Sequence, residues 1–262
     1  MEEIKLTSWQ EFEVKIKELF SKIEKLRDEK DRSYIPYPLF RGQSDSSWRL
    51  ITTLDRIREK ICCFEYHSIM ERVKSHVESV TGMYWDLPRF KESDGVPMPP
   101  EGYPFMVYLR HHQFPSPLLD WTRSQYIAAF FAFSDAQSQN DVGVFAYLET
   151  LGYGKSRRGS EARITTLGPN VKTHKRHYLQ QSEYTICTKK VNGKNFYWNH
   201  EEVFAVGNKY QDLLTKYVMP ISEKQTVLKK LDLMNINAYS LFHNEEGLMH
   251  TLAIKEFIIN DR

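Results

Sequence analysis

The chain has few cysteines, no long apolar run and almost no net charge. Its three cysteines, Cys62, Cys63 and Cys187, are odd in number and lack zinc-type spacing. Adjacent cysteines rarely bond to each other, because a disulfide holds its Cα atoms about 5.5–6 Å apart. No stretch reaches the roughly 18 consecutive apolar residues of a membrane span, and the first residues do not form a signal peptide. We therefore expect reduced thiols in a cytoplasmic protein that does not cross a membrane.

Sequence signatures of several common enzyme classes are also absent. The chain contains no G-x-x-x-x-G-K-[ST] or G-x-G-x-x-G phosphate loop, no G-x-S-x-G nucleophile turn and no H-E-x-x-H metal motif. His111 and His112 are adjacent, so in a helix or a strand they cannot both face one metal ion. The simplest interpretation is one core or surface histidine each. We expect neither a hydrolase of these classes nor a metal site.

One segment departs from the overall balance of charge. The 36 Lys and Arg residues are matched by 34 Asp and Glu, which leaves +2 and no general affinity for polyanions. Residues 155–178 nevertheless carry seven basic side chains against Glu161 alone. These basic residues are Lys155, Arg157, Arg158, Arg163, Lys172, Lys175 and Arg176. We predict a long loop here, either a solvated basic surface or a contact for nucleic acid.

Composition and periodicity indicate a folded α+β protein. A hydrophobic content of 41% with 27% charged residues is typical of a globular chain, and 262 residues suffice for one large domain or two small ones. Apolar spacing predicts helices over 8–30, 64–80, 124–136, 222–234 and 245–257. Strands are predicted at 142–148, 184–188 and 195–198. Because helices and strands alternate irregularly, the pattern favours α+β over a doubly wound sheet.

Three further segments connect these elements. Residues 34–54 indicate a strand, a polar turn and then a strand or short helix. Residues 86–104 are rich in proline and predict a surface loop, with a lid or a domain linker as alternatives. Residues 118–122, LLDWT, are predicted to form a turn directly before the helix over 124–136.

Two short segments carry residue types that suit ligand binding. Arg41 lies at the end of a predicted strand beside Gly42. A guanidinium group offers a two-pronged contact to phosphate, and glycine leaves room for its close approach. In LLDWT, Asp120 and Thr122 are candidates to cap the following helix. Trp121 is either a core residue or a stacking wall for a planar ring.

Three separated motifs together resemble a known family. They are FRGQSDSSWRL, then HHQFPSPLLDWT with the helix AAFFAF, and then RHYLQQSEY. In this order they resemble the FRG domain family, named after Phe-Arg-Gly. The similarity covers about residues 34–188 and ends weakly near 241–248. Family members usually have Gln-His-x-Gly, and Thr-Arg before Leu-Leu-Asp-Trp. This chain differs at 110–113 and 116–117, so the roles of those family side chains are not carried over.

The resemblance implies a fold and an activity. The expected fold is a single α+β domain over 1–262, with an ADP-ribosyltransferase-like mixed or antiparallel sheet core and N-terminal and flanking helices. The helix over 8–30 would precede a motif-bearing core at 34–188, and helices and strands at 200–262 would follow. FRG domains resemble remote relatives of ADP-ribosyltransferases and recur in bacterial toxin–antitoxin and anti-phage operons. NAD is the implied substrate, with no metal.

The template of that superfamily has an early arginine, an aromatic wall and a glutamate on a later strand. Arg41 fits the first place and would hold the phosphates of NAD. Gln181 and Glu183 resemble a Q-x-E element. Residues two apart on a strand share a face, so both would point into one cleft. Glu183 would stabilise the positive charge that develops on the ribose, as in glycoside cleavage, and Gln181 would orient the acceptor. Asp120 is the rival acid.

The same resemblance places further residues around NAD. Trp121 or Tyr184 would flank the nicotinamide. The full set expected to bind NAD is Arg41, Gly42, Gln43, His111, Asp120, Trp121, Thr122 and Tyr184.

RNA is the acceptor that the charge pattern favours, with mRNA as first choice and a protein side chain as the alternative. The basic segment lies just before Glu183 and would place positive charge beside the cleft. Its expected nucleic-acid contacts are Arg157, Arg158, Arg163, Lys172, Lys175 and Arg176. A toxin of this kind would need an antitoxin protein as partner. The alternatives to a transferase are an NAD glycohydrolase and a non-catalytic module that binds a nucleotide or nucleic acid.

Overall fold

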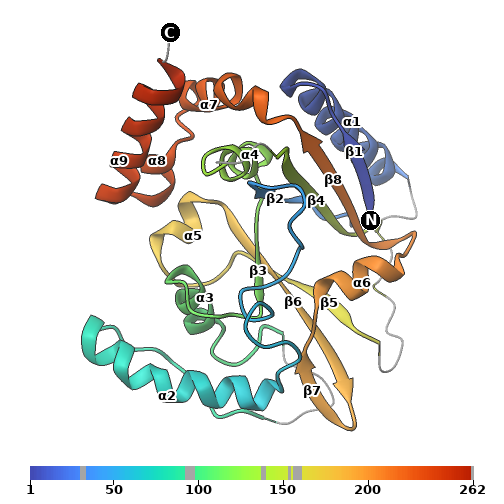
Figure 1. Ribbon diagram of the computed structural model, residues 1–262. Helices are drawn as coiled ribbons and strands as arrows, with labels where there is room; N and C mark the ends of the chain where they lie inside the picture. The colour runs from blue at the N-terminus through green and yellow to red at the C-terminus, as the bar shows by residue number, and fades with distance from the viewer. Residues whose placement is uncertain (30–33, 92–97, 137–139, 153–154, 156–160, 261–262) are drawn as a thin grey trace.

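The fold is described from a computed structural model over residues 1–29, 34–91, 98–136, 140–152, 155 and 161–260. Within these residues, eight strands form one sheet in the order β1-β8-β4-β2-β3-β6-β5, with β7 also paired to β6. In this described part of the chain β1 and β8 are parallel, and the other neighbours are antiparallel. The predicted α+β class with a mixed, mostly antiparallel sheet is confirmed (Figure 1).

The elements have the following bounds. The strands are β1 (Glu2–Lys5), β2 (Leu39–Gln43), β3 (Leu118–Thr122), β4 (Val142–Thr150), β5 (Arg163–Leu167), β6 (Ser182–Val191), β7 (Lys194–Tyr197) and β8 (Gln211–Met219). The α-helices are α1 (Trp9–Asp28), α2 (Cys63–Thr81), α3 (Tyr103–His111), α4 (Gln125–Phe133), α5 (Lys175–Leu179), α6 (His200–Val206), α7 (Lys224–Leu233), α8 (Ala238–Phe242) and α9 (Glu245–Ile254). Two other helical turns are the 3-10 helix η1 (Ile221–Glu223) and the π-helix η2 (Lys255–Ile259).

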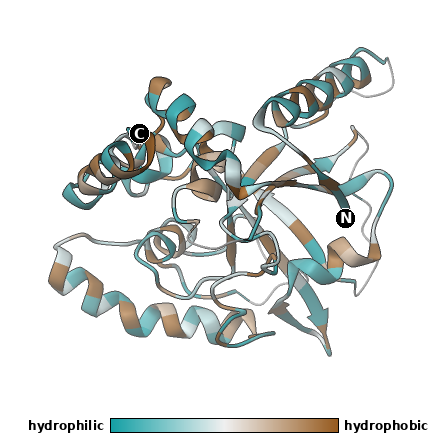
Figure 2. Cartoon of the chain, turned by 45° about the horizontal axis from the view of Figure 1, so that its top comes forward, coloured by the Kyte–Doolittle hydropathy of each residue, from teal (hydrophilic) through white to brown (hydrophobic). Residues whose placement is uncertain are grey.

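Local sequence explains where the predicted helices begin and end. The side chain of Ser8 accepts a hydrogen bond of 3.3 Å from the Glu11 main-chain nitrogen and so caps α1. Gly82 ends α2 with a φ of 68°, a conformation that glycine adopts without strain. Hydrophobic and hydrophilic residues alternate along α2, as expected of a helix with one packed side (Figure 2).

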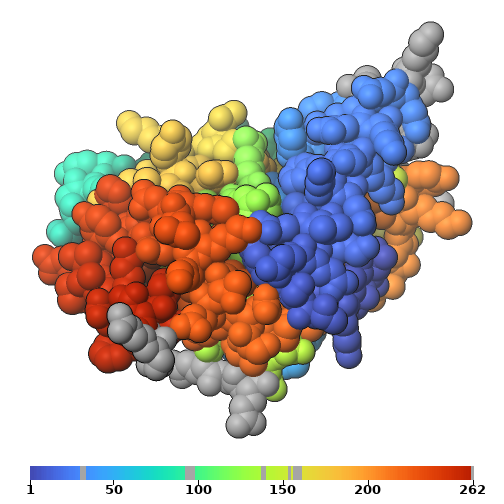
Figure 3. Space-filling model, turned by 90° about the horizontal axis from the view of Figure 1, so that it is seen from above, coloured from blue at the N-terminus to red at the C-terminus, as the bar shows by residue number. Residues whose placement is uncertain are grey.

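Two groups of helices cover one face of the sheet. Over the half formed by β8, β4 and β2, helices α1, α4, α7, α8 and α9 enclose a core around Phe12, Phe40 and Phe133. Over the half formed by β3 and β6, α2 and α3 enclose a second core around Tyr66 and Phe105. The groups lie toward opposite ends of the molecule (Figure 1), and α7–α9 lie beside α1 (Figure 3). We call this side the α3/α4 face, and the boundary between its two cores falls at β2 and β3.

The other side of the sheet, which we call the α6 face, has its own core. Trp121, Tyr147 and Phe204 pack there beneath α6. Strands β3 and β6 are antiparallel, with Asp120 opposite Tyr184 and Trp121 opposite Glu183. Opposite residues of such a pair share a face. Asp120 therefore faces α3 and α4, whereas Glu183 faces the α6 side.

The structure corrects several predicted elements. Residues 118–122 form strand β3 between β2 and β6, where the prediction was a turn. The segment 155–178, predicted as one long loop, contains β5 and α5. Strands β1 and β8, and helices α6 and α8, are elements that the sequence pattern did not indicate.

Two further predictions concern the cysteines and membrane-spanning segments. Cys62, Cys63 and Cys187 are free thiols, and the last two of these are buried. Among the described residues, no helix is both long enough and apolar enough to cross a bilayer.

Candidate functional site

Arg41 lies where strands β2 and β3 separate. The register of these two strands contains one residue pair, Phe40 with Thr122. Beyond it, Arg41 Nη1 donates a hydrogen bond of 2.8 Å to the main-chain oxygen of Asp120. Burial lowers the pKa of the Arg41 guanidinium to about 10, and the Asp120 carboxylate opposes this shift. The group is therefore still charged at neutral pH, and its buried Nε has no hydrogen-bond partner among the described residues.

The carboxylate of Asp120 is only half satisfied. Its Oδ2 forms an ion pair of 2.5 Å with Nη2 of Arg110, near the end of α3. In the described structure, Asp120 Oδ1 and Arg110 Nε are buried without a hydrogen-bond partner. Buried polar atoms are nearly always paired in native proteins. These atoms are therefore candidates to bind a ligand.

The three charged side chains line one cavity of about 280 Å³ between the sheet, α3 and α4. Arg41 and Asp120 come from the sheet, and Arg110 and His111 come from α3. The rest of the lining is formed by Phe40, Gly42, Trp121, Thr122, Phe131, Gln180 and Ser182. The cavity therefore lies at the boundary between the two cores of the α3/α4 face.

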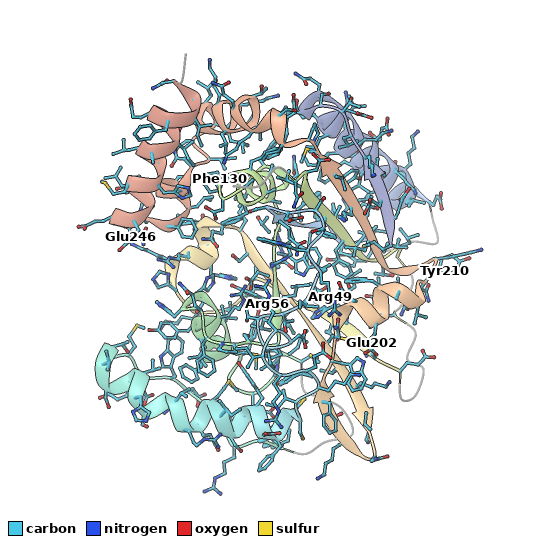
Figure 4. The ribbon with its side chains drawn as sticks, viewed as in Figure 1. Arg49, Arg56, Phe130, Glu202, Tyr210 and Glu246 are labelled. Atoms are coloured by element: carbon cyan, nitrogen blue, oxygen red, sulfur yellow. The ribbon has the colours of Figure 1, made fainter. Side chains whose placement is uncertain are left out.

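Positive charge exceeds negative charge around Arg41. Arg110 and Arg56 act on the guanidinium as like charges and contribute to its lowered pKa after burial. Arg56 is exposed, and its label lies near the centre of the view in Figure 4. Three guanidinium groups and the Asp120 carboxylate give these four side chains a net charge of 3 − 1 = +2. One guanidinium group can donate two parallel hydrogen bonds to two oxygens of a phosphate, so an anion with phosphate groups suits this site.

A chain of hydrogen bonds leads away from the cavity. His111 Nε2 lies 2.8 Å from the hydroxyl of Tyr184, and that hydroxyl lies 3.0 Å from His177 Nδ1. His177 Nε2 lies 2.7 Å from the main-chain oxygen of Pro169. Burial lowers the pKa of His111 to about 4, although Asp120 opposes the shift. His111 is therefore neutral at pH 7.

Glu183 belongs to a different cavity. It is buried on the α6 face, and its Oε1 accepts a hydrogen bond from Nε of Arg123 in an ion pair. With Arg123 and Glu149 it lines a cavity of about 460 Å³ that does not include Arg41. Gln181 is exposed, has a φ of 48° and precedes β6. The prediction that Gln181 and Glu183 share a strand face is wrong, because β6 begins only at Ser182.

Gly42 makes room for a helix. A Cβ atom at this position would lie 1.9 Å from the main-chain oxygen of Ala128 in α4. The missing side chain therefore lets α4 approach β2 closely, whereas the sequence interpretation assigned this space to a phosphate. Gln43 is buried and donates a hydrogen bond of 3.2 Å to the main-chain oxygen of Arg49, so it lies outside the cavity lining.

The LLDWT residues also differ from their expected roles. Ser124 caps α4, since its side chain accepts from the Ile127 nitrogen at 3.3 Å. Asp120 is therefore not the cap and is left to the cavity. Trp121 is a core residue: its ring stacks on Tyr147 with centroids 5.3 Å apart and is 3% exposed, so it offers no open wall to a planar ligand.

The basic segment is divided between different places. Lys155 is buried in an ion pair of 2.6 Å with Asp212, so it is not a free surface charge. Arg163 lies on β5 opposite Thr188, about 20 Å along β6 from Ser182. Arg157 and Arg158 lie outside the described residues.

Helix α5 brings two predicted basic residues close to the cavity. Lys175 and Arg176 lie in α5, and its C-cap, Gln180, lines the cavity. The guanidinium of Arg176 lies 5.3 Å from the ring centre of Phe242, and Lys175 is exposed. Lys172, also exposed, precedes this helix. These side chains are the part of the basic segment that remains a candidate for phosphate contacts.

Sequence reasoning missed five residues of the cavity lining, which are Phe40, Arg110, Phe131, Gln180 and Ser182. The available signal for Arg110 was Asp120 in the LLDWT motif. A carboxylate between apolar residues requires a nearby cation, and Arg110 directly precedes His111, which the sequence analysis had singled out. No comparable signal exists for Phe131 and Gln180, which reach the cavity through the packing of α4 and α5 against the sheet.

Comparison with known proteins identifies part of the chain. The family model of the FRG domain matches residues 37–141. This range contains Arg41, Arg110, His111 and Asp120, whereas Gln180 and Ser182 follow it. Neither the curated proteins nor the solved structures include a match. The FRG resemblance predicted from the motifs is thus confirmed by a match to the family model over residues 37–141.

Proposed function

We propose that this chain is an NAD-dependent ADP-ribosyltransferase that binds NAD in the Arg41–Asp120 cavity. One observation carries the proposal. Arg41 donates to the main-chain oxygen of Asp120, and Arg110 pairs with the Asp120 carboxylate, whose Oδ1 is buried and unpaired among the described residues. A site of this composition offers phosphate contacts and a negative charge within one cavity.

The arginines are assigned to the diphosphate of NAD. Guanidinium groups bind phosphate oxygens through two parallel N–H bonds. Arg41, Arg110 and Arg56 with Asp120 carry a net charge of 3 − 1 = +2. This excess matches the two negative charges of a diphosphate, which supports a dinucleotide ligand.

Asp120 is assigned to the ribose. When the bond between nicotinamide and C1′ breaks, its electron pair leaves with the nicotinamide, and positive charge develops on the ribose. A fixed carboxylate beside that charge stabilises the transition state. The acceptor atom then forms the new bond to C1′ and loses its proton. The unpaired Asp120 Oδ1 is available to accept a hydrogen bond from a ribose hydroxyl.

The arrangement favours Asp120 over Glu183 as the acid. Both were candidates, but Asp120 shares a cavity with Arg41. Glu183 faces another cavity and is paired with Arg123. Glu183 is therefore the control carboxylate in the experiment below.

RNA remains the proposed acceptor, with mRNA favoured. Lys175 and Arg176 on α5 support it, because they place positive charge beside the cavity where a phosphate backbone can lie. An antitoxin partner, a role in phage defence and a cytoplasmic location belong to the same proposal. Their support is the FRG domain and the three free cysteines.

A non-catalytic nucleotide-binding module is the second candidate function. The cavity of about 280 Å³ is slightly smaller than most ligand pockets, which run from about 300 to 1,000 Å³. This size favours a mononucleotide, bound without reaction. An NAD glycohydrolase would use the same residues as the transferase, with water as the acceptor.

The test is to incubate the purified chain with adenylate-labelled NAD and either total RNA or lysate protein. Released nicotinamide is measured alongside transferred label, for the wild type, Asp120→Asn and Glu183→Gln. Label on RNA that is lost only in Asp120→Asn supports the proposal. Label on protein changes the acceptor, and nicotinamide release without transfer indicates a glycohydrolase. A folded wild type that releases no nicotinamide contradicts both enzymes and leaves the binding module.

A further inference from the structure

The hydrogen-bond chain behind the cavity has a defined direction. The main-chain oxygen of Pro169 can only accept, so His177 Nε2 carries a hydrogen and donates to it at 2.7 Å. In the tautomer with its hydrogen on Nε2, the other nitrogen, Nδ1, is an acceptor, and it accepts the hydroxyl hydrogen of Tyr184 at 3.0 Å. The Tyr184 oxygen in turn accepts from His111 Nε2 at 2.8 Å. The Pro169 oxygen, which cannot donate, thus assigns the hydrogen positions along the whole chain of hydrogen bonds.

This direction fixes the state of His111 at the cavity. With its hydrogen on Nε2, neutral His111 has a lone pair on Nδ1. Among the described residues, Nδ1 forms no hydrogen bond, whereas the ring itself lines the Arg41–Asp120 cavity. The ring is held in place by Tyr184, whose ring also stacks on His177 with centroids 5.7 Å apart. A neutral, oriented imidazole with one free acceptor is the form of histidine that can take up a proton.

We infer that His111 is the general base of the transfer reaction and that Tyr184 and His177 are the positioning residues that hold it in the basic tautomer. The inference rests on the proposed function and deepens it. It assigns the acceptor to a neutral nucleophile that carries a proton, such as a hydroxyl group of RNA. An acceptor that is already ionised would have no use for this base.

The proton and charge balance as follows. The acceptor oxygen forms its bond to C1′ while the nicotinamide bond breaks, and its proton goes to His111 Nδ1. His111 then passes its Nε2 proton to the Tyr184 oxygen, and Tyr184 passes its own hydroxyl proton to His177 Nδ1. The positive charge comes to rest on His177, and no oxidant or reductant is required.

Electrostatics gives the relay a reason. Burial first, and then the neighbouring His177, Arg110 and His174, lower the pKa of His111, while Asp120 acts in the opposite direction. A positive charge is therefore unfavourable on His111, next to the Arg110 guanidinium group. Transfer along Tyr184 moves the charge to His177. His111 is then neutral with its hydrogen on Nδ1, and loss of the proton from His177 with return of the hydrogens along the chain regenerates the Nε2–H form for the next turnover.

The first experiment reads the tautomers and does not depend on activity. Two-bond ¹H–¹⁵N correlation spectra of the labelled full chain at pH 7 distinguish protonated from unprotonated ring nitrogens. We expect His111 and His177 both to carry hydrogen on Nε2. In Tyr184→Phe we expect the ¹⁵N chemical shift of His177 Nδ1 to change, because this nitrogen loses the Tyr184 hydroxyl as its hydrogen-bond donor. A hydrogen on His111 Nδ1 in the wild type overturns the inference, whatever the enzyme assay shows.

The second experiment separates this role from a structural one. General-base catalysis contributes about 10²–10⁴-fold, so we expect His111→Gln to slow transfer by about 100-fold or more. Tyr184→Phe should slow it at least tenfold, with the Kd for NAD changed less than twofold. Tyr103→Phe is the matched control, since Tyr103 packs against Tyr184 with ring centroids 6.2 Å apart but lies outside the relay. It should transfer at the wild-type rate.

The outcomes distinguish the two proposals. Normal transfer by Tyr184→Phe, from an active wild type, overturns the relay and leaves the transferase intact. Equal losses in Tyr184→Phe and Tyr103→Phe also overturn it, because they indicate packing alone. No NAD cleavage by the wild type overturns the proposed function and, with it, the role of His111 as a base in this reaction.

Discussion

The two faces of strands β3 and β6 carry similar charges but differ in what those charges leave unpaired. On the α3/α4 face, Asp120 pairs with Arg110, whose side chain is 18% exposed, and its Oδ1 has no partner among the described residues. On the α6 face, Glu183 pairs with Arg123, which is 51% exposed. An ion pair on the sheet is therefore by itself a poor marker of a site. The informative sign is a buried polar atom that the described fold does not satisfy.

The largest expected difference between the faces is in catalysis. Removing a preorganised charge from a transition state costs about 10²–10³-fold in rate. We expect Asp120→Asn to lower kcat/KM for nicotinamide release by that factor. Glu183→Gln should stay within about threefold of wild type. Circular dichroism and thermal unfolding of both variants show whether each is folded. The opposite ranking would return the acid to the α6 face.

The next difference is in packing, and two glycines test it. At Gly42 a Cβ would lie 1.9 Å from the Ala128 oxygen, whereas at Gly143 on the adjacent β4 the nearest heavy atom is at 3.5 Å. We expect Gly42→Ala to lower the free energy of unfolding by about 3 kcal/mol, because α4 must move away from β2. Gly143→Ala should change it by less than about 1 kcal/mol. Urea unfolding measures both. Equal stabilities would mean that α4 does not sit this close to β2.

A buried histidine on the α6 face is expected to make stability depend on pH. Burial lowers the pKa of His200 to about 3. In the unfolded chain a histidine binds its proton near pH 6.5, so acidification favours the unfolded state until the folded pKa is reached. When the pH falls from 7 to 5, His200 should lower the free energy of unfolding by about 2 kcal/mol.

The matched comparison is His200→Gln, measured by urea unfolding at both pH values. Its loss between pH 7 and pH 5 should be smaller than that of the wild type by about 2 kcal/mol. His111 contributes a loss of the same sign in both proteins, because burial also lowers its pKa. Parallel pH dependence of the two proteins would contradict a neutral, buried His200.

The smallest expected effect concerns the proposed RNA acceptor. Lys175 lies on α5 beside the cavity, whereas Lys209 is an exposed lysine after α6. Loss of one phosphate contact weakens binding several-fold and reduces the slope of log K against log salt by about 1. We expect this result for Lys175→Ala and no change for Lys209→Ala, with fluorescently labelled RNA in a salt titration. Identical losses would indicate only a general dependence on net charge.

The helices were predictable because their burial is local. The spacing of apolar residues places α1, α2 and α4 close to their observed bounds. Strand β8 escaped prediction because two of its buried positions are the polar Asp212 and Lys216. Asp212 is satisfied by Lys155 and by the Tyr147 hydroxyl, and Lys216 is satisfied by Glu3. All three partners are distant in sequence, so the residues of β8 alone do not show the alternation of apolar and polar positions that predicts a strand.

The site was predictable by residue type but not by face. Arg41 and Asp120 were singled out from their motifs, and both line the cavity. Whether Asp120 or its neighbour Trp121 faces α3 depends on the register of β3 with β6, and a shift of one residue exchanges the two faces. Arg41 lies opposite Phe145, which belongs to the core of the α6 face, and its side chain reaches the main-chain oxygen of Asp120 where β2 and β3 separate. Register is set by tertiary packing, which a single sequence does not display.

The strand order has a consequence for how the protein is made. Strands β2 and β3 lie within residues 37–141, which match the FRG family model, but their partners β4 and β6 follow this range in the chain. Strand β1, at residues 2–5, also pairs with β8, at residues 211–219, so segments distant in sequence meet in the sheet. During synthesis the cavity cannot close before Gln180 and Ser182 have emerged, well past the segment that carries its charged residues. A nascent chain from which Gln180 and Ser182 have not yet emerged therefore has no assembled site.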